Sequence, residues 1–203
     1  MKIGIFGGTF DPIHNVHLFV AESARLLEGL DRVLFVPTNN QHYRNGAQVE
    51  DAHRCAMILG AISDNPAFAL DESDLTAGAS GYTADLLPRL HVKYPDAAFT
   101  FIIGADSVVT NTWVRFDEVL DALERFVIAP RAGIGGDALA RVLAVVPAAL
   151  RARIDTLQLP ELPESATLIR TLLAQGRSVR YLVPASVWQY IQTHKLYLQG
   201  HSP

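Results

Sequence analysis

The chain has 203 residues, of which 49% are hydrophobic and 19% are charged, so it can bury a sizeable core and is not a disordered tail. A net charge of −4 and a pI near 5.9 exclude the strongly basic surface typical of nucleic-acid-coating proteins. No apolar run approaches the ~20 residues that span a bilayer. From the charge and the run lengths together, we expect neither a nucleic acid nor a membrane as partner. The lone cysteine, Cys55, cannot form an internal disulfide and predicts a small buried side chain in a reducing, cytoplasmic compartment.

Apolar periodicity and turn residues predict alternating strands and helices along the whole chain. Pro88 falls within one of the helices and should begin or kink a turn there. In chain order we expect a strand at 2–6, a helix at 17–27, a strand at 31–36, a helix at 51–63, a strand at 68–70, a helix at 82–94, strands at 99–103, 125–129 and 154–159, and helices at 167–175 and 185–193.

This alternation predicts an α/β fold, a doubly wound parallel sheet of the Rossmann-like kind, because strands joined through helices pair in parallel. Ligands of such sheets bind beyond the carboxyl ends of the strands. Functional residues should therefore lie in the loops after Phe6, Val36 and Ile103 and near Ser165. The glycine-rich stretch 133–136 is typical of a surface loop.

A glycine pair and two histidines follow the first strand. Gly7 and Gly8 allow a sharp turn and a close approach to a ligand, and the next helix, beginning near Val16, points its positive end at that turn. His14 and His17 are three residues apart, so they can face one side and stabilise charge on a leaving pyrophosphate. The segment is neither a P-loop nor a dinucleotide fingerprint.

Two other interpretations of this segment exist. Gly7 and Gly8 could form a plain tight turn beside incidental histidines. His14 and His17 could instead be two ligands of a zinc ion, but the sequence offers no convincing third ligand and no nearby cysteine, so we predict no protein-held metal.

The full segment resembles the T-F-D-x-x-H-x-G-H signature of the nucleotidyltransferase superfamily, and its longer form looks like that of bacterial nicotinate-nucleotide adenylyltransferases. The resemblance implies condensation of ATP with nicotinate mononucleotide to deamido-NAD and pyrophosphate, a step of NAD biosynthesis. Val16 stands where the family has glycine. The segment reads Gly7-Gly8-Thr9-Phe10-Asp11-Pro12-Ile13-His14-Asn15-Val16-His17, and the resemblance assigns ATP binding to Gly7, Gly8, Thr9, Phe10, His14 and His17.

Two later segments complete the implied ATP site. Arg44 matches a basic position of the family after the second strand and would neutralise phosphates, unless it is a solvated loop arginine. The run from Glu164 to Arg170 resembles the family's I-S-S-T-x-I-R. It places Ser165 and Thr167 at a helix N-terminus, and Arg170 lies three residues after Thr167 on the same face.

The resemblance also implies a mononucleotide site in the middle of the chain. Tyr82 and Thr83 resemble the family's (S/T)-Y-T, where backbone groups at a helix start bind the pyridine carboxylate, although Thr83 also suits a plain N-cap. Asp106 lies in a match to I-G-x-D-S and is alternatively a helix cap. Trp113 offers a flat surface for the pyridine ring or packs in the core. Arg131 resembles the arginine of R-P-G.

The resemblance runs from residue 3 to about 197, which implies a single nucleotidyltransferase domain over 1–203, with helices at about 165–197 completing the ATP site. We expect direct in-line transfer, in which catalysis is positioning and charge stabilisation by His14, His17 and Arg170. Mg²⁺ would accompany ATP, held mainly by phosphate oxygens and water.

Related functions stay open from sequence alone. The acceptor could be nicotinamide mononucleotide or another phosphorylated molecule such as phosphopantetheine, which the Gly-Gly-Thr start and the Gly-Tyr-Thr segment disfavour. Val16, Ala166 and the altered loop at 40–43 also keep open a nucleotide-binding regulator with weakened catalysis. The sequence leaves the assembly state open, a homo-oligomer included.

Overall fold

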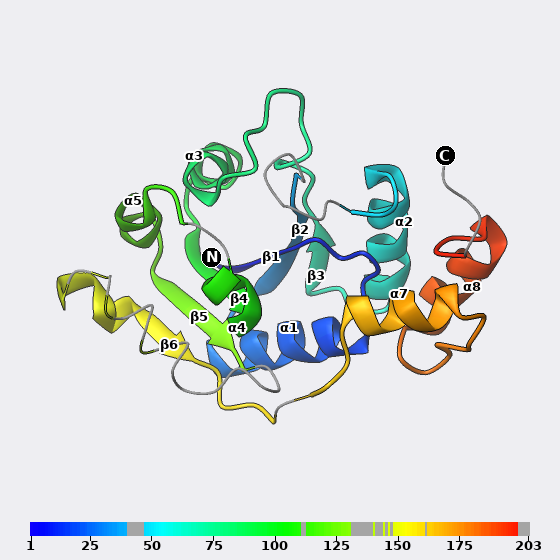
Figure 1. The fold of residues 1–203 in the computed structure, drawn as a ribbon. Helices are drawn as coiled ribbons and strands as arrows, with labels where there is room; N and C mark the ends of the chain where they lie inside the picture. The colour runs from blue at the N-terminus through cyan, green and yellow to red at the C-terminus, as the bar shows by residue number, and fades with distance from the viewer. Residues whose placement is uncertain are drawn as a thin grey trace.

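The computed structural model describes residues 1–39, 47–110, 113–130, 140, 144, 146, 148–160 and 162–198 (Figure 1). Its strands are β1 (Lys2–Gly8), β2 (Arg32–Pro37), β3 (Phe68–Leu70), β4 (Ala98–Gly104), β5 (Arg125–Ala129) and β6 (Ile154–Thr156). Its helices are α1 (Asn15–Leu27), α2 (Asp51–Ile62), α3 (Thr83–Lys93), α4 (Ala105–Thr110), α5 (Phe116–Asp121), the 3-10 helix η2 (Ala148–Arg153), α7 (Ala166–Ala174) and α8 (Ala185–His194).

In the described part of the chain the strands form one six-stranded parallel sheet in the order β3-β2-β1-β4-β5-β6. The chain builds outward from β1 through β2 to β3, then crosses to the other side of β1 and continues from β4 to β6. The strand order therefore reverses between β1 and β4, where a doubly wound sheet opens its ligand crevice. The predicted α/β class and parallel pairing are confirmed.

Each face of the sheet is covered by its own hydrophobic layer, because neighbouring residues of a strand point to opposite faces. Ile3 and Ile5 of β1 lie in one layer and Phe6 lies in the other. Figure 1 shows α3 and α5 to the left of the sheet and α2 and α8 to the right. The first layer takes buried side chains from α3, α4 and α5, and the second takes them from α1, α2, α7 and α8.

The structure differs from the predicted elements at several points. α1 begins two residues early, at Asn15, because His14 adopts extended backbone and serves as its N-cap. α3 contains Pro88, as the single helix predicted at 82–94 does, and buried Leu87 and Leu90 hold it on the sheet. β6 ends at Thr156, and the short helices α4 and α5 were not predicted. The loop predicted at 133–136 lies outside the described residues.

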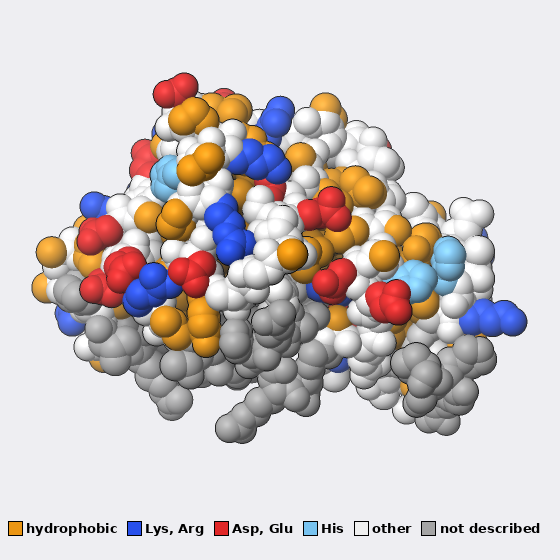
Figure 2. All heavy atoms as spheres, turned by 90° about the horizontal axis from the view of Figure 1, so that it is seen from above, with side chains coloured by type: hydrophobic (Ala, Val, Ile, Leu, Met, Phe, Trp, Pro, Cys, Tyr) orange, Lys and Arg blue, Asp and Glu red, His pale blue; other side chains and the backbone are white. Residues whose placement is uncertain are grey.

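The surface seen in Figure 2 carries acidic and basic side chains side by side, with no continuous basic area on that face. Within the described ranges, no helix combines the length and apolar character needed to cross a bilayer. Cys55 is buried, as predicted, and burial raises the pKa of its thiol to about 12, so the thiol stays protonated and unreactive.

Gly81 lies directly before the N-cap of α3, where the backbone is left-handed and close to Asn39. Its φ is +76°, and a Cβ placed there would lie 2.8 Å from the Asn39 carbonyl oxygen, whereas Gly78 has a φ of +79° with nothing within 4 Å. Gly78→Ala should cost about 1–2 kcal/mol from backbone strain alone. Gly81→Ala should cost about 1–3 kcal/mol more, because the Asn39 carbonyl must also move. Urea unfolding of both variants measures the difference, and equal losses would contradict the close approach.

Candidate active site

The loop between β1 and α1 lies at the switch point and folds back over the end of its own strand. Phe10 adopts a left-handed φ of 50° and its ring is buried against Phe6 and His17. A Cβ at Gly8 would lie 3.0 Å from that ring, so only glycine leaves room for Phe10 to cover the strand end. The loop is thus held by packing before any ligand binds.

The two histidines meet at the first turn of α1. Their rings stack with centroids 3.7 Å apart, and the His14 amide donates to His17 Nδ1 over 3.2 Å. His14 is 1% exposed, and His17 is half-buried. Because Nδ1 of His17 accepts this bond, the neutral ring carries its proton on Nε2, which is the tautomer able to donate to a phosphate oxygen.

The start of α1 is braced by the segment that precedes α8. The Asn15 amide donates to the Leu182 carbonyl over 3.1 Å, and the Asn15 side chain donates to the Tyr181 carbonyl over 2.7 Å. Val16, which replaces the family's glycine, is half-buried and packs against the layer of α1 and α2. Its methyl groups therefore contribute to the packing of α1 against the hydrophobic core.

Arg170 of α7 reaches the same loop from 159 residues away. Its Nη1 donates to the Asp11 carbonyl over 2.7 Å, and its Nη2 donates to Thr167 Oγ1 over 3.4 Å. Ser165 is the N-cap of α7, and its Oγ accepts from the Leu168 amide over 3.1 Å. The structure thus brings together the two end segments that the sequence singled out.

Arg54 of α2 is a residue of this site that sequence reasoning missed. Its side chain is fully buried, with Nη1 donating to the Thr9 carbonyl over 2.8 Å and Nη2 to the Thr38 carbonyl over 3.0 Å. It also pairs with Asp51 at 2.5 Å. One guanidinium therefore ties the loop after β1 to the loop after β2. The only sequence signal is a charged residue on the apolar face of a helix, next to Cys55.

The start of α3 carries the predicted carboxylate-binding pair. Tyr82 is the N-cap and Thr83 is the first helical residue, so the interpretation of Thr83 as a plain N-cap is wrong. Asp85, in the first turn of α3, accepts from Ser80 Oγ over 2.6 Å and pairs with Arg115. The hydrogen bond from Ser80, followed by that from Arg115, lowers the pKa of Asp85.

Asp106 and Trp113 follow β4. Asp106 is in the first turn of α4 and folds back over Gly104, where a Cβ would lie 2.6 Å from its Oδ1. Trp113 is half-buried, and its Nε1 donates to the Val108 carbonyl over 3.4 Å. The packing expected as an alternative role for Trp113 is present, since its indole contacts the rings of Phe101, Phe116 and Phe126.

Arg44 and Arg131 lie outside the described residues, as do His42 and Tyr43. The chain enters the first of these segments at Asn39, whose amide donates to Asp74 Oδ2 over 3.0 Å and whose side chain donates to the Ala79 carbonyl over 3.1 Å. Burial raises the pKa of Asp74, and the bond from Asn39 partly opposes this.

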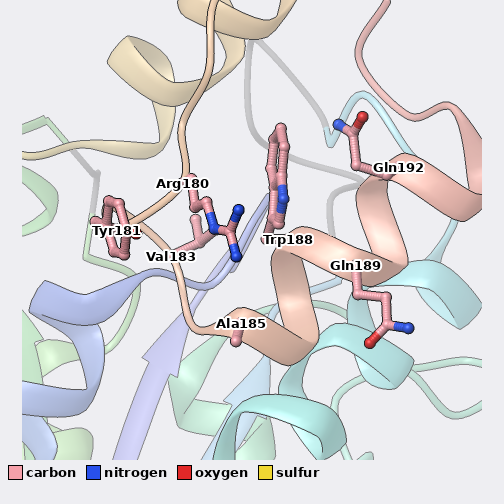
Figure 3. Close-up of a pocket in the computed structure, with 7 residues that line it drawn as sticks. All are labelled: Arg180, Tyr181, Val183, Ala185, Trp188, Gln189 and Gln192. Atoms are coloured by element: carbon pink, nitrogen blue, oxygen red, sulfur yellow. The ribbon is translucent and has the colours of Figure 1, made fainter.

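A separate cavity of about 450 Å³ lies between α8 and the segment before it (Figure 3). Figure 3 shows the guanidinium of Arg180 extending toward the indole of Trp188 on α8, with the ring of Tyr181 pointing the other way. Among the described residues, its lining includes no histidine and no acidic residue, and it shares no residue with the β1–α1 loop. The cavity is therefore separate from the histidine pair.

Among the described residues, no three His, Cys, Asp or Glu side chains come together as metal ligands. The carboxylate nearest the histidines along the chain, that of Asp11, is only 2% exposed and accepts bonds from the Gln48 amide and the Tyr197 hydroxyl. These bonds hold the Asp11 carboxylate within the loop.

The sheet order, together with a stacked histidine pair at the start of α1, defines an α/β protein of the nucleotidyltransferase class. The cytidylyltransferase-like family model matches residues 5–172. The chain is 36% identical over 203 residues to the probable nicotinate-nucleotide adenylyltransferase of Symbiobacterium thermophilum, covering 99% of this chain and 97% of that protein. It is 40% identical to the corresponding protein of Thermomicrobium roseum, covering 97% and 91%.

Solved structures match the fold over almost the whole chain. The Plasmodium falciparum nicotinic acid mononucleotide adenylyltransferase complexed with NaAD aligns with a TM-score of 0.75 at 21% identity, covering 97% of both chains. A putative nicotinate-nucleotide adenylyltransferase from Vibrio parahaemolyticus aligns with a TM-score of 0.68, covering 98% of this chain and 96% of that one. The chain belongs to the cytidylyltransferase-like family and, within it, to the nicotinate-nucleotide adenylyltransferases.

Arg54 provides a test of how the site is held. Arg54→Met should lower the free energy of unfolding by about 2–4 kcal/mol, because the Thr9 and Thr38 carbonyls lose their donors inside the protein. Arg54→Lys keeps the charge but not the planar fork, so it should recover only part of this loss. Denaturant titration measures both variants. Stability of Arg54→Met within about 0.5 kcal/mol of wild type, the range of ordinary surface changes, would refute the structural role.

Proposed function

We propose that this chain catalyses adenylyl transfer from ATP to nicotinate mononucleotide, giving deamido-NAD and pyrophosphate. One observation carries the proposal. His14 and His17 stack at the end of the β1–α1 loop, at the switch point of the sheet, and Arg170 of α7 bonds the same loop at Asp11. The full-length relatives, which are named for this activity, support it.

The reaction is an in-line displacement at phosphorus. An oxygen of the acceptor's 5′-phosphate forms a bond to the α-phosphorus of ATP. The bond from that phosphorus to the oxygen bridging to the β-phosphate breaks, and pyrophosphate leaves with the electron pair. Nε2–H of His17 and the guanidinium of Arg170 stabilise the charge that grows on the leaving group, and His14 fixes the ring of His17. No covalent enzyme intermediate is needed.

The remaining ATP contacts divide between backbone and side chains. Gly7, Gly8 and Thr9 bring backbone close to the phosphates, and Phe10 acts through its backbone because its ring is buried. The hydroxyl groups of Ser165 and Thr167 at the start of α7 and the side chain of Arg44 add further contacts to ATP.

The acceptor lies across the switch point, at the helices that follow β3 and β4. Backbone groups at Tyr82 and Thr83 bind the pyridine carboxylate at the positive end of α3. Asp106 contacts a ribose, Trp113 presents an edge or face to the pyridine ring, and Arg131 neutralises the acceptor phosphate. Mg²⁺ enters as the MgATP substrate, held by phosphate oxygens and water. The lone reduced Cys55 suits a cytoplasmic enzyme, active alone or as a homo-oligomer.

A pyrophosphate-release assay with MgATP and three acceptors tests the reaction. We expect kcat/KM with nicotinate mononucleotide to exceed that with nicotinamide mononucleotide by about tenfold or more, because a carboxylate at a helix N-terminus gains up to ~2 kcal/mol that an amide does not. Phosphopantetheine should give no turnover. Equal rates with the two pyridine nucleotides would refute the carboxylate site, and no turnover with any acceptor would favour a nucleotide-binding regulator.

His17 provides the sharpest test of the catalytic assignment. His17→Ala should lower kcat by about a hundredfold or more, because it removes a donor to the leaving group. His17→Asn is the matched control, since its amide can replace Nδ1 as acceptor for the His14 amide but has no group at the Nε2 position. Both variants should be equally inactive. Recovery of activity in His17→Asn would assign the residue to capping α1, and more than a tenth of the wild-type rate in His17→Ala would reject the role.

A further inference from the structure

Asp11 lies in the middle of the β1–α1 loop, and donors from three distant segments meet on it. Tyr197, beyond α8, donates its hydroxyl to Asp11 Oδ1 over 2.6 Å. The Gln48 amide donates to Asp11 Oδ2 over 2.7 Å, and Arg170 donates to the Asp11 carbonyl over 2.7 Å. The carboxylate is 2% exposed, so these bonds are made away from bulk water, where loss of a donor is costly.

The chain after α8 turns back sharply to bring Tyr197 to this position. Lys195 and Tyr197 both adopt left-handed backbone, with φ of 54° and 64°, and the Leu196 amide closes the helix end by donating to the Ile191 carbonyl. Non-glycine residues keep such conformations where surrounding contacts fix them. Tyr197 packs against the hydrophobic layer of α1 and α2. Burial, reinforced by the Asp11 charge, raises the pKa of Tyr197, so the hydroxyl remains a donor.

We propose that Tyr197 is a positioning residue for ATP: by bonding the Asp11 carboxylate, it fixes the loop that presents the backbone of residues 7–10 and His14 to the triphosphate. The proposal rests on the proposed function and adds to it a residue from the end of the chain. Asp11 also links this loop to Gln48 through its carboxylate and to Arg170 through its backbone carbonyl. The helices α3 and α4, where the proposed acceptor residues lie, pack their buried side chains into the opposite hydrophobic layer from Tyr197.

The experiment compares Tyr197→Phe with a matched control, Tyr94→Phe. Tyr94 also donates its hydroxyl to a buried carboxylate, Asp71, over 3.1 Å, but at the end of α3 and in the other layer. Each variant removes one hydroxyl from one Tyr–Asp pair. The readouts are the unfolding temperature, the KM values for ATP and nicotinate mononucleotide, kcat, and the Kd of MgATP measured by calorimetry without acceptor.

Tyr197→Phe should raise KM and Kd for MgATP roughly tenfold, the effect of losing one hydrogen bond to a charged group, while KM for the acceptor changes less than about twofold. Both variants should lower the unfolding temperature by similar amounts, because each loses one hydrogen bond to a buried carboxylate. Tyr94→Phe should leave all KM and Kd values unchanged. Unchanged MgATP affinity in Tyr197→Phe, or an equal change in Tyr94→Phe, overturns the proposal.

Asp11→Ala tests the same bond from the acceptor side and serves if Tyr197→Phe does not fold. It should raise KM and Kd for MgATP at least as much, since the Gln48 bond is lost too, and adding Tyr197→Phe should cause little further loss, because the hydroxyl no longer has its acceptor. Fully additive losses overturn the proposal. If the wild-type enzyme binds MgATP but forms no product with nicotinate mononucleotide, the proposed function fails, and the calorimetric comparison still decides the role of Tyr197.

Discussion

The site depends on how the backbone carbonyls of one short loop are satisfied. Between β1 and α1 the chain is neither strand nor helix, so the carbonyls of Thr9 and Asp11 have no partner in regular secondary structure. Arg54 and Arg170 supply the donors from helices α2 and α7. A buried carbonyl without a donor would cost free energy comparable to a lost hydrogen bond, so this loop shape requires both arginines.

The bonds from the arginines to the loop carbonyls also determine the direction in which the neighbouring backbone N–H groups point. Because a peptide unit is planar, a Thr9 carbonyl directed at Arg54 turns the following amide, that of Phe10, away from Arg54. The buried Phe10 ring and the close approach at Gly8 prevent the chain from rotating out of this arrangement. Arg54, Gly8 and Phe10 therefore stabilise the same backbone conformation of the loop. That conformation determines where the histidine pair lies.

The sequence predicted what is encoded locally and missed what is encoded at a distance. The glycines, the histidine spacing and the apolar periodicity all lie within short windows, and they located β1 and α1 to within two residues, along with the parallel sheet. Gly7 and Gly8 end β1, whereas the sequence placed them just after the strand. Arg54 and Tyr197 contact the loop from 45 and 186 residues away, and no local pattern marks such partners. The helix predicted at 82–94 forms despite Pro88, because burial of α3 on the sheet outweighs the single lost hydrogen bond.

The two hydrophobic layers give a physical reason for treating the two substrates separately. The residues proposed for ATP are attached to β1, α1 and α7, and those proposed for the acceptor to α3 and the chain after β4, which pack on opposite faces of the sheet. The strands separate the two layers, and the order of the sheet reverses between β1 and β4, the two strands from which both sets of residues follow. A change confined to one layer, such as loss of the Tyr197 hydroxyl, therefore alters one substrate's contacts first, whereas a change in β1 itself must alter both.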